Sequence, residues 1–198
     1  AMYPGGKGGN QAAAAALLGA KVHYFGRIGD DYFSHELIRS LSEKGVEVSS
    51  IIKTEKGIAG LAMIRVDKTG QNSITFTPGA NYLLSQEDVN NCESLFQPGS
   101  ILLSSMEIPT QTVFAAIRKA KKNKMFVILD PAPAPHEPIP DDIPPLVDIM
   151  KPNESEASIL TQIPVTDIES AYLAGLKLIK MGFHCPIVTL GEKGLIFP

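Results

Sequence analysis

Four glycines between Gly5 and Gly9 surround a single lysine, Lys7, and Asn10 follows them directly. Glycine has no β-carbon, so a ligand can approach the peptide N–H groups of this stretch closely. Residues 12–18 are alanines and leucines, which favour a helix, and the start of a helix offers unpaired N–H groups and partial positive charge. The combination suits polar hydroxyls or a phosphate. Tight packing of a turn against a sheet is the alternative explanation.

Three further places carry polar or glycine residues directly after a predicted strand, where ligands of open α/β sheets bind. Glu107 is the first, and its alternative role is a charge in the first turn of a helix. The second is Asn153 with Glu156, whose spacing also fits a capping pair at a helix start. The third is residues 189–194, whose glycines either let the backbone pass close to a ligand or form a hairpin turn.

The elements that must position these residues alternate between strand and helix. Such an order implies an α/β fold with a mostly parallel sheet and helices on both faces. Hydrophobic patterns predict strands at residues 22–25, 100–104, 125–129, 147–150 and 186–190. They predict helices at residues 85–96, 109–123, 153–160 and 167–181. A further helix is capped by Asp30 or Asp31 and stops at Gly45.

Two of the predicted helices show a definite apolar stripe, which we expect to be buried. In the helix at residues 109–123 the stripe consists of Val113, Ala116, Ile117 and Ala120. In the helix at residues 167–181 it consists of Ile168, Ala171, Tyr172, Gly175 and Ile179. The proline-rich run at residues 131–145 is too poor in N–H donors for a helix or a central strand, so we predict a surface crossing there.

Residues 57–78 differ from the rest of the chain. Two β-rich runs, residues 58–66 and 71–77, are joined by a short polar loop at residues 67–70 that ends in glycine. This pattern predicts a β-hairpin. Because the surrounding chain alternates strand and helix, we expect the hairpin to stand apart from the main sheet.

Composition narrows the class of protein. A chain of 198 residues with 44% hydrophobic residues is long enough to bury a core, and a single domain over residues 1–198 is expected. The formal net charge of -3 argues against nucleic-acid partners, and no apolar run is long enough to cross a membrane. Cys92 and Cys185 fit neither a disulfide framework nor a zinc site, which favours a reducing cytoplasm.

The glycine-rich stretch resembles the first signature of the PfkB carbohydrate kinases. Asn10, Ala12, Gly19 and Gly29 fill the later positions of that signature at matching intervals. The pattern Gly-Gly-Lys-Gly-x-Asn-Gln-Ala is typical of ribokinases within this family. Two shorter family motifs follow in the same order, Asn-x-x-Glu at residues 153–156 and Thr-Leu-Gly-x-x-Gly at residues 189–194.

This resemblance implies a ribokinase-like fold, a carbohydrate kinase and a set of roles. The residues implied to bind the sugar are Gly6, Lys7, Gly8, Asn10 and Glu107. Those implied to bind ATP are Asn153, Thr189, Gly191 and Gly194, and Glu156 is implied to bind Mg²⁺. A monovalent cation such as K⁺ is a further candidate. The hairpin becomes a lid that pairs with its twin in a homodimer, where Ala62, Ile64 and Phe76 either wall the sugar pocket or pack the hairpin's own buried face.

The resulting hypothesis is ATP-dependent phosphorylation of D-ribose to D-ribose 5-phosphate. Two alternatives stay open, namely another PfkB sugar or nucleoside kinase, fructokinase-like for example, and a non-catalytic sugar- or nucleotide-binding module. The family's amino-terminal Asn-x-Asp strand and its Asp-Thr-x-Gly-Ala-Gly-Asp motif do not occur in these residues. The chain therefore looks truncated at both ends, with the catalytic base expected beyond Pro198, and the isolated residues are expected to be poorly active or inactive.

Overall fold

The computed structural model describes residues 3–66, 68, 72–135 and 137–198. It divides into two compact units. Unit 1 comprises Ala1–Leu84 and Glu107–Pro109, and unit 2 comprises Ser85–Met106 and Thr110–Pro198. A single domain over the whole chain stays a prediction. Within the described residues, no helix combines the length and the apolar character needed to cross a membrane.

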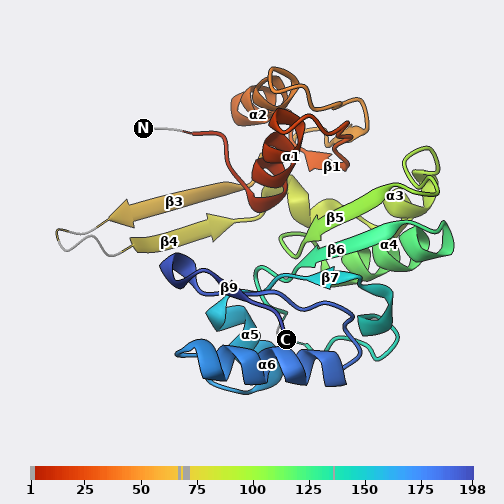
Figure 1. The fold of residues 1–198 in the computed structure, drawn as a ribbon. Helices are drawn as coiled ribbons and strands as arrows, with labels where there is room; N and C mark the ends of the chain where they lie inside the picture. Colours follow the sequence, from red (N-terminus) through yellow and green to blue (C-terminus); the bar gives the residue numbers. More distant parts are fainter. Residues whose placement is uncertain (1–2, 67, 69–71, 136) are drawn as a thin grey trace. The chain divides into compact units, whose positions relative to one another are not determined.

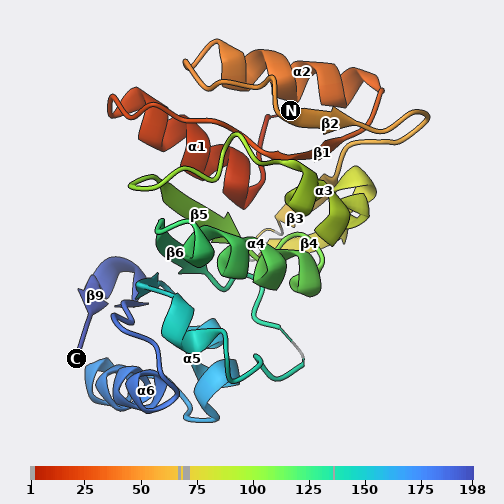
Figure 2. The same cartoon turned by 90° about the vertical axis from the view of Figure 1, so that its right-hand side faces the viewer.

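Unit 1 brings two helices together with a short parallel strand pair, as Figures 1 and 2 show. Ala12 of the first helix, Leu41 of the second and Val46 form its buried apolar cluster. The elements in chain order are α1 (Lys7–Leu17), β1 (Gly26–Ile28), α2 (Tyr32–Ser42), β2 (Ile51–Lys53), β3 (Leu61–Val66), β4 (Asn72–Thr77) and the 3₁₀ helix η1 (Gly79–Leu83).

The predicted strand at residues 22–25 lies a few residues too early. Strand β1 starts at Gly26, which pairs with Ile51 of β2 in parallel register, and Ile28 pairs with Lys53. Upstream of β1, His23 forms only an isolated bridge to Glu47. A strand exists only where a partner runs beside it, and the hydrophobic pattern does not reveal where that partner begins.

Helix α2 begins as predicted, and it ends at Ser42, shortly before the predicted stop at Gly45. Its N-cap is Asp31, whose carboxylate accepts a hydrogen bond from the Ser34 N–H at 3.0 Å. Gly45 follows the helix with a φ of 82°, a backbone conformation that suits glycine. The same Asp31 carboxylate also accepts from the Ala59 N–H at 3.2 Å. One acidic side chain thus joins the helix to the segment that leads into β3.

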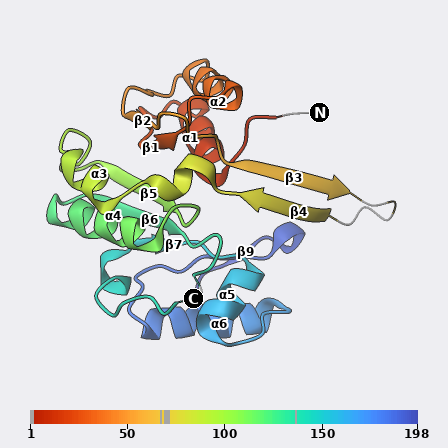
Figure 3. The same ribbon diagram turned by 180° about the vertical axis from the view of Figure 1, so that it is seen from behind.

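Strands β3 and β4 form the predicted antiparallel hairpin, with Leu61 opposite Thr77 and Val66 opposite Asn72. Most of the predicted loop, residues 67 and 69–71, lies outside the described residues. At the base of the hairpin, the backbone of Gly79 lies close to that of Ile58. A β-carbon on Gly79 would be 2.5 Å from the Ile58 carbonyl oxygen. The two strands form a sheet of their own, as predicted. Figures 1 and 3 show this hairpin projecting away from the helices of its unit.

Unit 2 has the predicted alternation of strands and helices. The core strands β5, β6 and β7 are parallel, with Ile101 opposite Phe126 and Ile128 opposite Ile149. Its elements are α3 (Gln86–Asn91), β5 (Ile101–Ser105), α4 (Thr110–Lys122), β6 (Phe126–Asp130), η2 (Pro144–Leu146), β7 (Ile149–Met150), α5 (Glu154–Thr161), α6 (Ile168–Lys180), β8 (Val188–Thr189), η3 (Gly191–Lys193) and β9 (Leu195–Ile196).

Helix α4 packs against β5 and β6 with the predicted stripe. Val113, Ala116, Ile117 and Ala120 are all buried. In the proline-rich run, the described residues between β6 and η2 form neither a helix nor a strand, as expected.

Helix α3 is shorter than the predicted helix at residues 85–96. It begins at a capping box, in which Ser85 and Asp88 bond each other's backbone N–H. It ends at Asn91, where the Lys119 ammonium from α4 donates to the carbonyl oxygens of Val89 and Asn90, at 2.8 and 2.7 Å. A lysine from another helix satisfies the last carbonyls, a contact that no local pattern reveals.

The predicted buried stripe of α6 is partly wrong. Ala171 and Gly175 are buried as expected, but Ile168, Tyr172 and Ile179 are 56%, 45% and 40% exposed. The buried positions are instead Ala171, Ala174, Gly175 and Leu178. Small residues face inward because the packing is close, and a β-carbon on Gly175 would lie 2.9 Å from the Pro198 ring.

We expect the substitution Asp31→Ala to lower the free energy of unfolding by about 1–2 kcal/mol, the usual loss for a helix cap. Urea unfolding followed by circular dichroism measures the change. The matched control is Asp30→Ala, because the Asp30 carboxylate is exposed and pairs, at 3.3 Å, with a His35 ring that is also exposed. Equal losses for the two variants would contradict the role given to Asp31.

The Asp31 link should also weaken in acid. Partial burial alone would raise the pKa of this carboxyl, but hydrogen bonds from Ser34 and from the Ala59 N–H lower the pKa below its ordinary value. The stabilisation is therefore complete above the pKa of the unfolded chain and is lost as pH falls through the folded pKa. Asp31→Asn should flatten the pH dependence of stability in that acidic range, and an unchanged profile would count against the link.

Candidate functional site

The glycine-rich stretch is the start of helix α1, not a loop ahead of it. The helix begins at Lys7, so Gly8, Gly9 and Asn10 lie in its first turn, and Gly6 is the N-cap with φ 91° and ψ 140°. The expectation of a helix over residues 12–18, after the glycines, therefore placed the helix start too late. Glycine disfavours the middle of a helix, but it is tolerated at the start, where the first N–H groups have no helical partner in any case.

One hydrogen bond joins this helix start to Glu107. The Lys7 N–H donates to Glu107 Oε2 at 2.8 Å, across 100 positions in the sequence. A β-carbon on Gly6 would lie 3.8 Å from the same oxygen, so the carboxylate lies against the N-cap. The structure therefore brings together Gly6, Lys7 and Glu107, as the sequence predicted.

The first turn of α1 holds further donors. The N–H groups of Gly8 and Gly9 precede the first intrahelical acceptor, and Gly6 has no side chain that could cap them. A β-carbon on Gly9 would meet nothing within 4 Å, and Asn10 is exposed. Within the described part of unit 1, no carboxylate forms an ion pair with the Lys7 ammonium. These donors, beside an acceptor at Glu107, match the hydroxyls of a small polar ligand.

Tyr24 lies behind this turn and was not identified from the sequence. Its hydroxyl would be 3.1 Å from a β-carbon on Gly8. Burial, and then the negative charge of Glu107, raise the pKa of the Tyr24 hydroxyl, so it stays neutral at physiological pH. A tyrosine in a short apolar run carries no local signal of this contact, which arises only from the fold.

The three predicted lid residues share one face of the hairpin. Ala62 lies directly opposite Phe76, and Ile64 is two residues along the same strand from Ala62. All three are exposed, as is every residue of β3. The alternative in which they pack a buried face of the hairpin itself is therefore not what the structure shows. Their contact with a sugar stays a prediction.

In unit 2, Asn153 and Glu156 form the capping box of α5. The Asn153 side chain accepts from the Glu156 N–H at 2.9 Å, and Glu156 Oε2 accepts from the Asn153 N–H at 2.8 Å. Asn153 is exposed, whereas Glu156 is 8% exposed. The capping role is thus confirmed, and their contact with a nucleotide stays a prediction.

Residues 189–194 lie beside this capping box. The Thr189 N–H donates to the Pro152 carbonyl oxygen at 2.9 Å, and Thr189 bridges to Asn153 in parallel. The segment is also the turn of the β8–β9 hairpin, in which Thr189 pairs with Leu195. Gly191 and Gly194 have φ of 56° and 89° and are exposed. Gly191 and Gly194 therefore leave this turn without side chains near Asn153, while the Gly194 N–H and carbonyl oxygen are bonded within the turn to Gly191 and Leu190.

The chemistry of this region fits a magnesium ion held largely by a nucleotide. Glu156 supplies a carboxylate, and Mg²⁺ is commonly bound by one or two carboxylates together with substrate phosphates. Across the described residues, no cluster of three or more histidine, cysteine or acidic side chains offers a complete metal cage. Glu156 is also partly committed to its helix cap.

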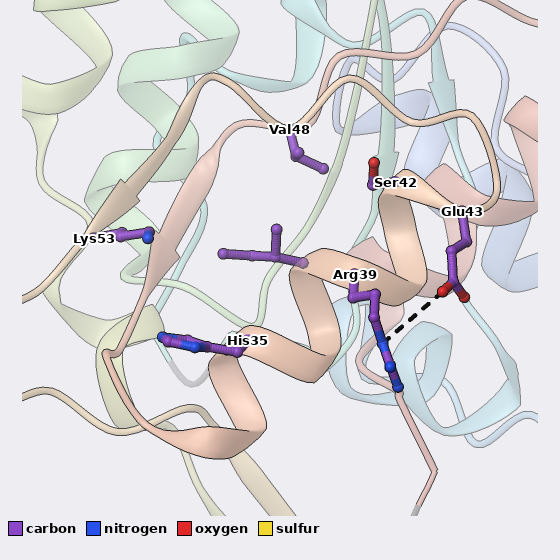
Figure 4. A pocket seen from close by; sticks show the side chains of 7 residues that line it. His35, Arg39, Ser42, Glu43, Val48 and Lys53 are labelled. Atoms are coloured by element: carbon purple, nitrogen blue, oxygen red, sulfur yellow. Dashed lines mark ion pairs between the residues drawn. The ribbon is translucent and has the colours of Figure 1, made fainter.

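A shallow hollow of about 330 Å³ lies on the surface of unit 1 between α2 and the chain near β2 (Figure 4). Arg39 lies on its rim but is paired with Glu36 and, at 3.9 Å, with Glu43. None of the predicted site residues lines it.

Sequence comparison decides the family. The sequence model of the pfkB family carbohydrate kinases matches residues 1–197. The chain belongs to this family. A ribokinase of Haemophilus influenzae is 39% identical over 191 residues, which are 96% of this chain and 62% of that protein. A deoxyribokinase of Salmonella typhi is 36% identical over 98% of this chain and 63% of its own length. The chain therefore spans less than two thirds of these pfkB relatives.

Solved structures agree with this assignment. The structure of Arabidopsis thaliana ribokinase complexed with ribose and ATP superposes with a TM-score of 0.82 at 32% identity, over 98% of this chain and 62% of that one. Ribokinase from Thermotoga maritima gives a TM-score of 0.81 at 35% identity, over 99% of this chain and 63% of that one. The predicted ribokinase-like α/β fold is confirmed.

The role of Gly6 at the start of α1 can be tested by substitution. Its φ and ψ belong to a region that is essentially restricted to glycine, so we expect Gly6→Ala to lower the free energy of unfolding by about 1–3 kcal/mol. Gly5→Ala is the control, because a β-carbon there meets nothing within 4 Å. Urea unfolding of both variants measures the difference, and equal stabilities would disprove the strain argument.

Proposed function

We propose that the whole protein carrying this chain transfers the γ-phosphoryl group of ATP to a hydroxyl of D-ribose and forms D-ribose 5-phosphate. The observation that carries the proposal is the contact between the Lys7 N–H and Glu107, which places an acceptor beside the open donors of α1. Family membership and the ribokinase relative at 39% identity support it.

On the sugar side, each group has a distinct role. Lys7 and Asn10 donate hydrogen bonds to the sugar hydroxyls, and Glu107 accepts one. Gly6 and Gly8 keep the backbone bare so that the sugar can approach it. The Lys7 ammonium also offsets negative charge on the migrating phosphoryl group. Ala62, Ile64 and Phe76 form an apolar lid over the ring.

On the nucleotide side, Asn153, Thr189, Gly191 and Gly194 bind ATP, and Glu156 helps to hold Mg²⁺. The metal neutralises charge on the phosphates when it is bound. Phosphoryl transfer depends mainly on positioning and charge neutralisation, and both are what these backbone and side-chain groups supply. A monovalent cation such as K⁺ is part of the proposal. No residue of this chain is assigned as the general base.

The proposal extends to assembly and location. The hairpin also exposes the apolar side chains of Leu61 and Met63 on the face opposite the lid residues, and this exposed surface favours pairing with the hairpin of a second copy in a homodimer. We place the enzyme in the cytoplasm, where ATP is available. Nucleic acid and membrane are not among its proposed partners.

A second candidate is a related sugar as the acceptor. The deoxyribokinase relative, at 36% identity, favours 2-deoxyribose. Ribose and 2-deoxyribose differ by one hydroxyl, and a site built to bond that hydroxyl discriminates strongly against its absence.

A coupled assay of ADP release tests the proposal. We expect ATP-dependent turnover with D-ribose that exceeds turnover with 2-deoxyribose, fructose or a nucleoside. If turnover is greater with another of these acceptors, that acceptor and not ribose is the substrate. Sugar or nucleotide binding without any turnover would overturn the kinase proposal in favour of a binding module.

The substitution Glu156→Gln separates the metal role from the helix cap. The amide keeps an oxygen for the Asn153 N–H, so stability should change by less than about 0.5 kcal/mol. Losing the charge should weaken Mg²⁺-dependent ATP binding, measured by titration calorimetry. Asp167→Asn at the start of α6 is the control, since Asp167 also forms a capping box. Unchanged magnesium dependence would contradict the metal role of Glu156.

A further inference from the structure

Tyr24 and Gly8 meet behind the first turn of α1. A β-carbon built on Gly8 would lie 3.1 Å from Tyr24 Oη but 3.7 and 3.8 Å from the two nearest ring carbons. Contacts near 3.1 Å require the neighbour to move, whereas 3.7 and 3.8 Å are ordinary van der Waals distances. The hydroxyl is therefore the part of Tyr24 that restricts position 8.

The Tyr24 ring also has a packing role, because it lies against the cluster formed by Ala12, Leu41 and Val46. A phenylalanine would fill that space equally well. The hydroxyl adds something different, since it extends past the cluster to the backbone of Gly8. Packing of the ring and contact of the hydroxyl can thus be separated by removing a single oxygen atom.

The turn that Tyr24 supports is the turn that holds Glu107. Gly8 is bonded directly to Lys7, whose N–H donates to the Glu107 carboxylate. The negative charge of Glu107 also acts on Tyr24, where it adds to the effect of burial in raising the pKa of the hydroxyl. The hydroxyl, Gly8, Lys7 and Glu107 are therefore neighbours in one small region of unit 1.

We propose that the Tyr24 hydroxyl is a positioning group for the sugar site. It fixes the backbone of Gly8, and through it the Lys7 N–H that holds Glu107, and it makes glycine necessary at position 8. This inference rests on the proposed sugar site. Tyr24 acts through the first turn of α1, so its removal should affect sugar affinity more than the rate of phosphoryl transfer.

A double-mutant cycle tests the inference in the whole protein. The four proteins are the wild type, Tyr24→Phe, Gly8→Ala and the double variant. Tyr24→Phe alone should raise KM for the sugar by about two- to tenfold with little change in kcat, because the first turn of α1 is held less firmly once the hydroxyl is gone. Gly8→Ala should cost more than about tenfold in sugar affinity, because a small displacement of a binding group is costly.

The decisive result is the coupling between the two positions. In the Tyr24→Phe background the alanine has room, so most of the loss caused by Gly8→Ala should be recovered. Gly9→Ala is the control, because a β-carbon there meets nothing within 4 Å and its effect should be the same in both backgrounds. Calorimetric titration with D-ribose gives sugar affinity, and thermal unfolding confirms that each variant is folded.

Two results would overturn the inference. One is an equal loss from Gly8→Ala in both backgrounds, as happens if the alanine blocks the sugar directly. The other is coupling in thermal stability without coupling in sugar affinity, which would leave Tyr24 a purely structural residue. Failure of the proposed function looks different, since the wild type itself would then show no turnover with ribose or the other sugars.

Discussion

The hydrogen bond from the Lys7 N–H to Glu107 is the contact on which the candidate sugar site depends. It connects the first turn of α1 with a carboxylate 100 positions away, and both belong to unit 1. A carboxylate at a helix N-terminus is favoured by the helix dipole and by the charge on the acceptor. Gly6, with a φ of 91°, allows the helix to start where this bond forms.

The start of α1 differs from that of most other helices in this chain. Side chains of their own N-cap residues cap α2, α3, α5 and α6. Helix α1 has a glycine at this position, and its acceptor comes from a distant carboxylate. A side-chain cap would occupy the N–H groups that a ligand needs. The missing cap therefore leaves donors available, while Glu107 and Tyr24 supply the order that a local cap would otherwise give.

In the candidate nucleotide region, unlike at the start of α1, the helix is capped by its own side chains. Asn153 and Glu156 bond each other's backbone and complete a local capping box, and the Thr189 N–H is bonded to Pro152. Here the structural role is satisfied within the chain, and the exposed Gly191 and Gly194 keep the hairpin turn free of side chains. A residue with a complete structural role can still contact a ligand through its remaining atoms. For this reason a charge-removing substitution is more informative at Glu156 than a truncation.

The sequence by itself determined the α/β class, the capped start of α2 and the hairpin, because each depends on local spacing. A long motif also pointed to Gly6 and Lys7, which the structure places beside Glu107. Tertiary structure alone decided the end of α3, the inward face of α6 and the contact between Tyr24 and Gly8. In these cases the deciding partner, such as Lys119 or Pro198, comes from another part of the chain. Local patterns report the preferences of a segment, whereas close packing selects which of those preferences the fold satisfies.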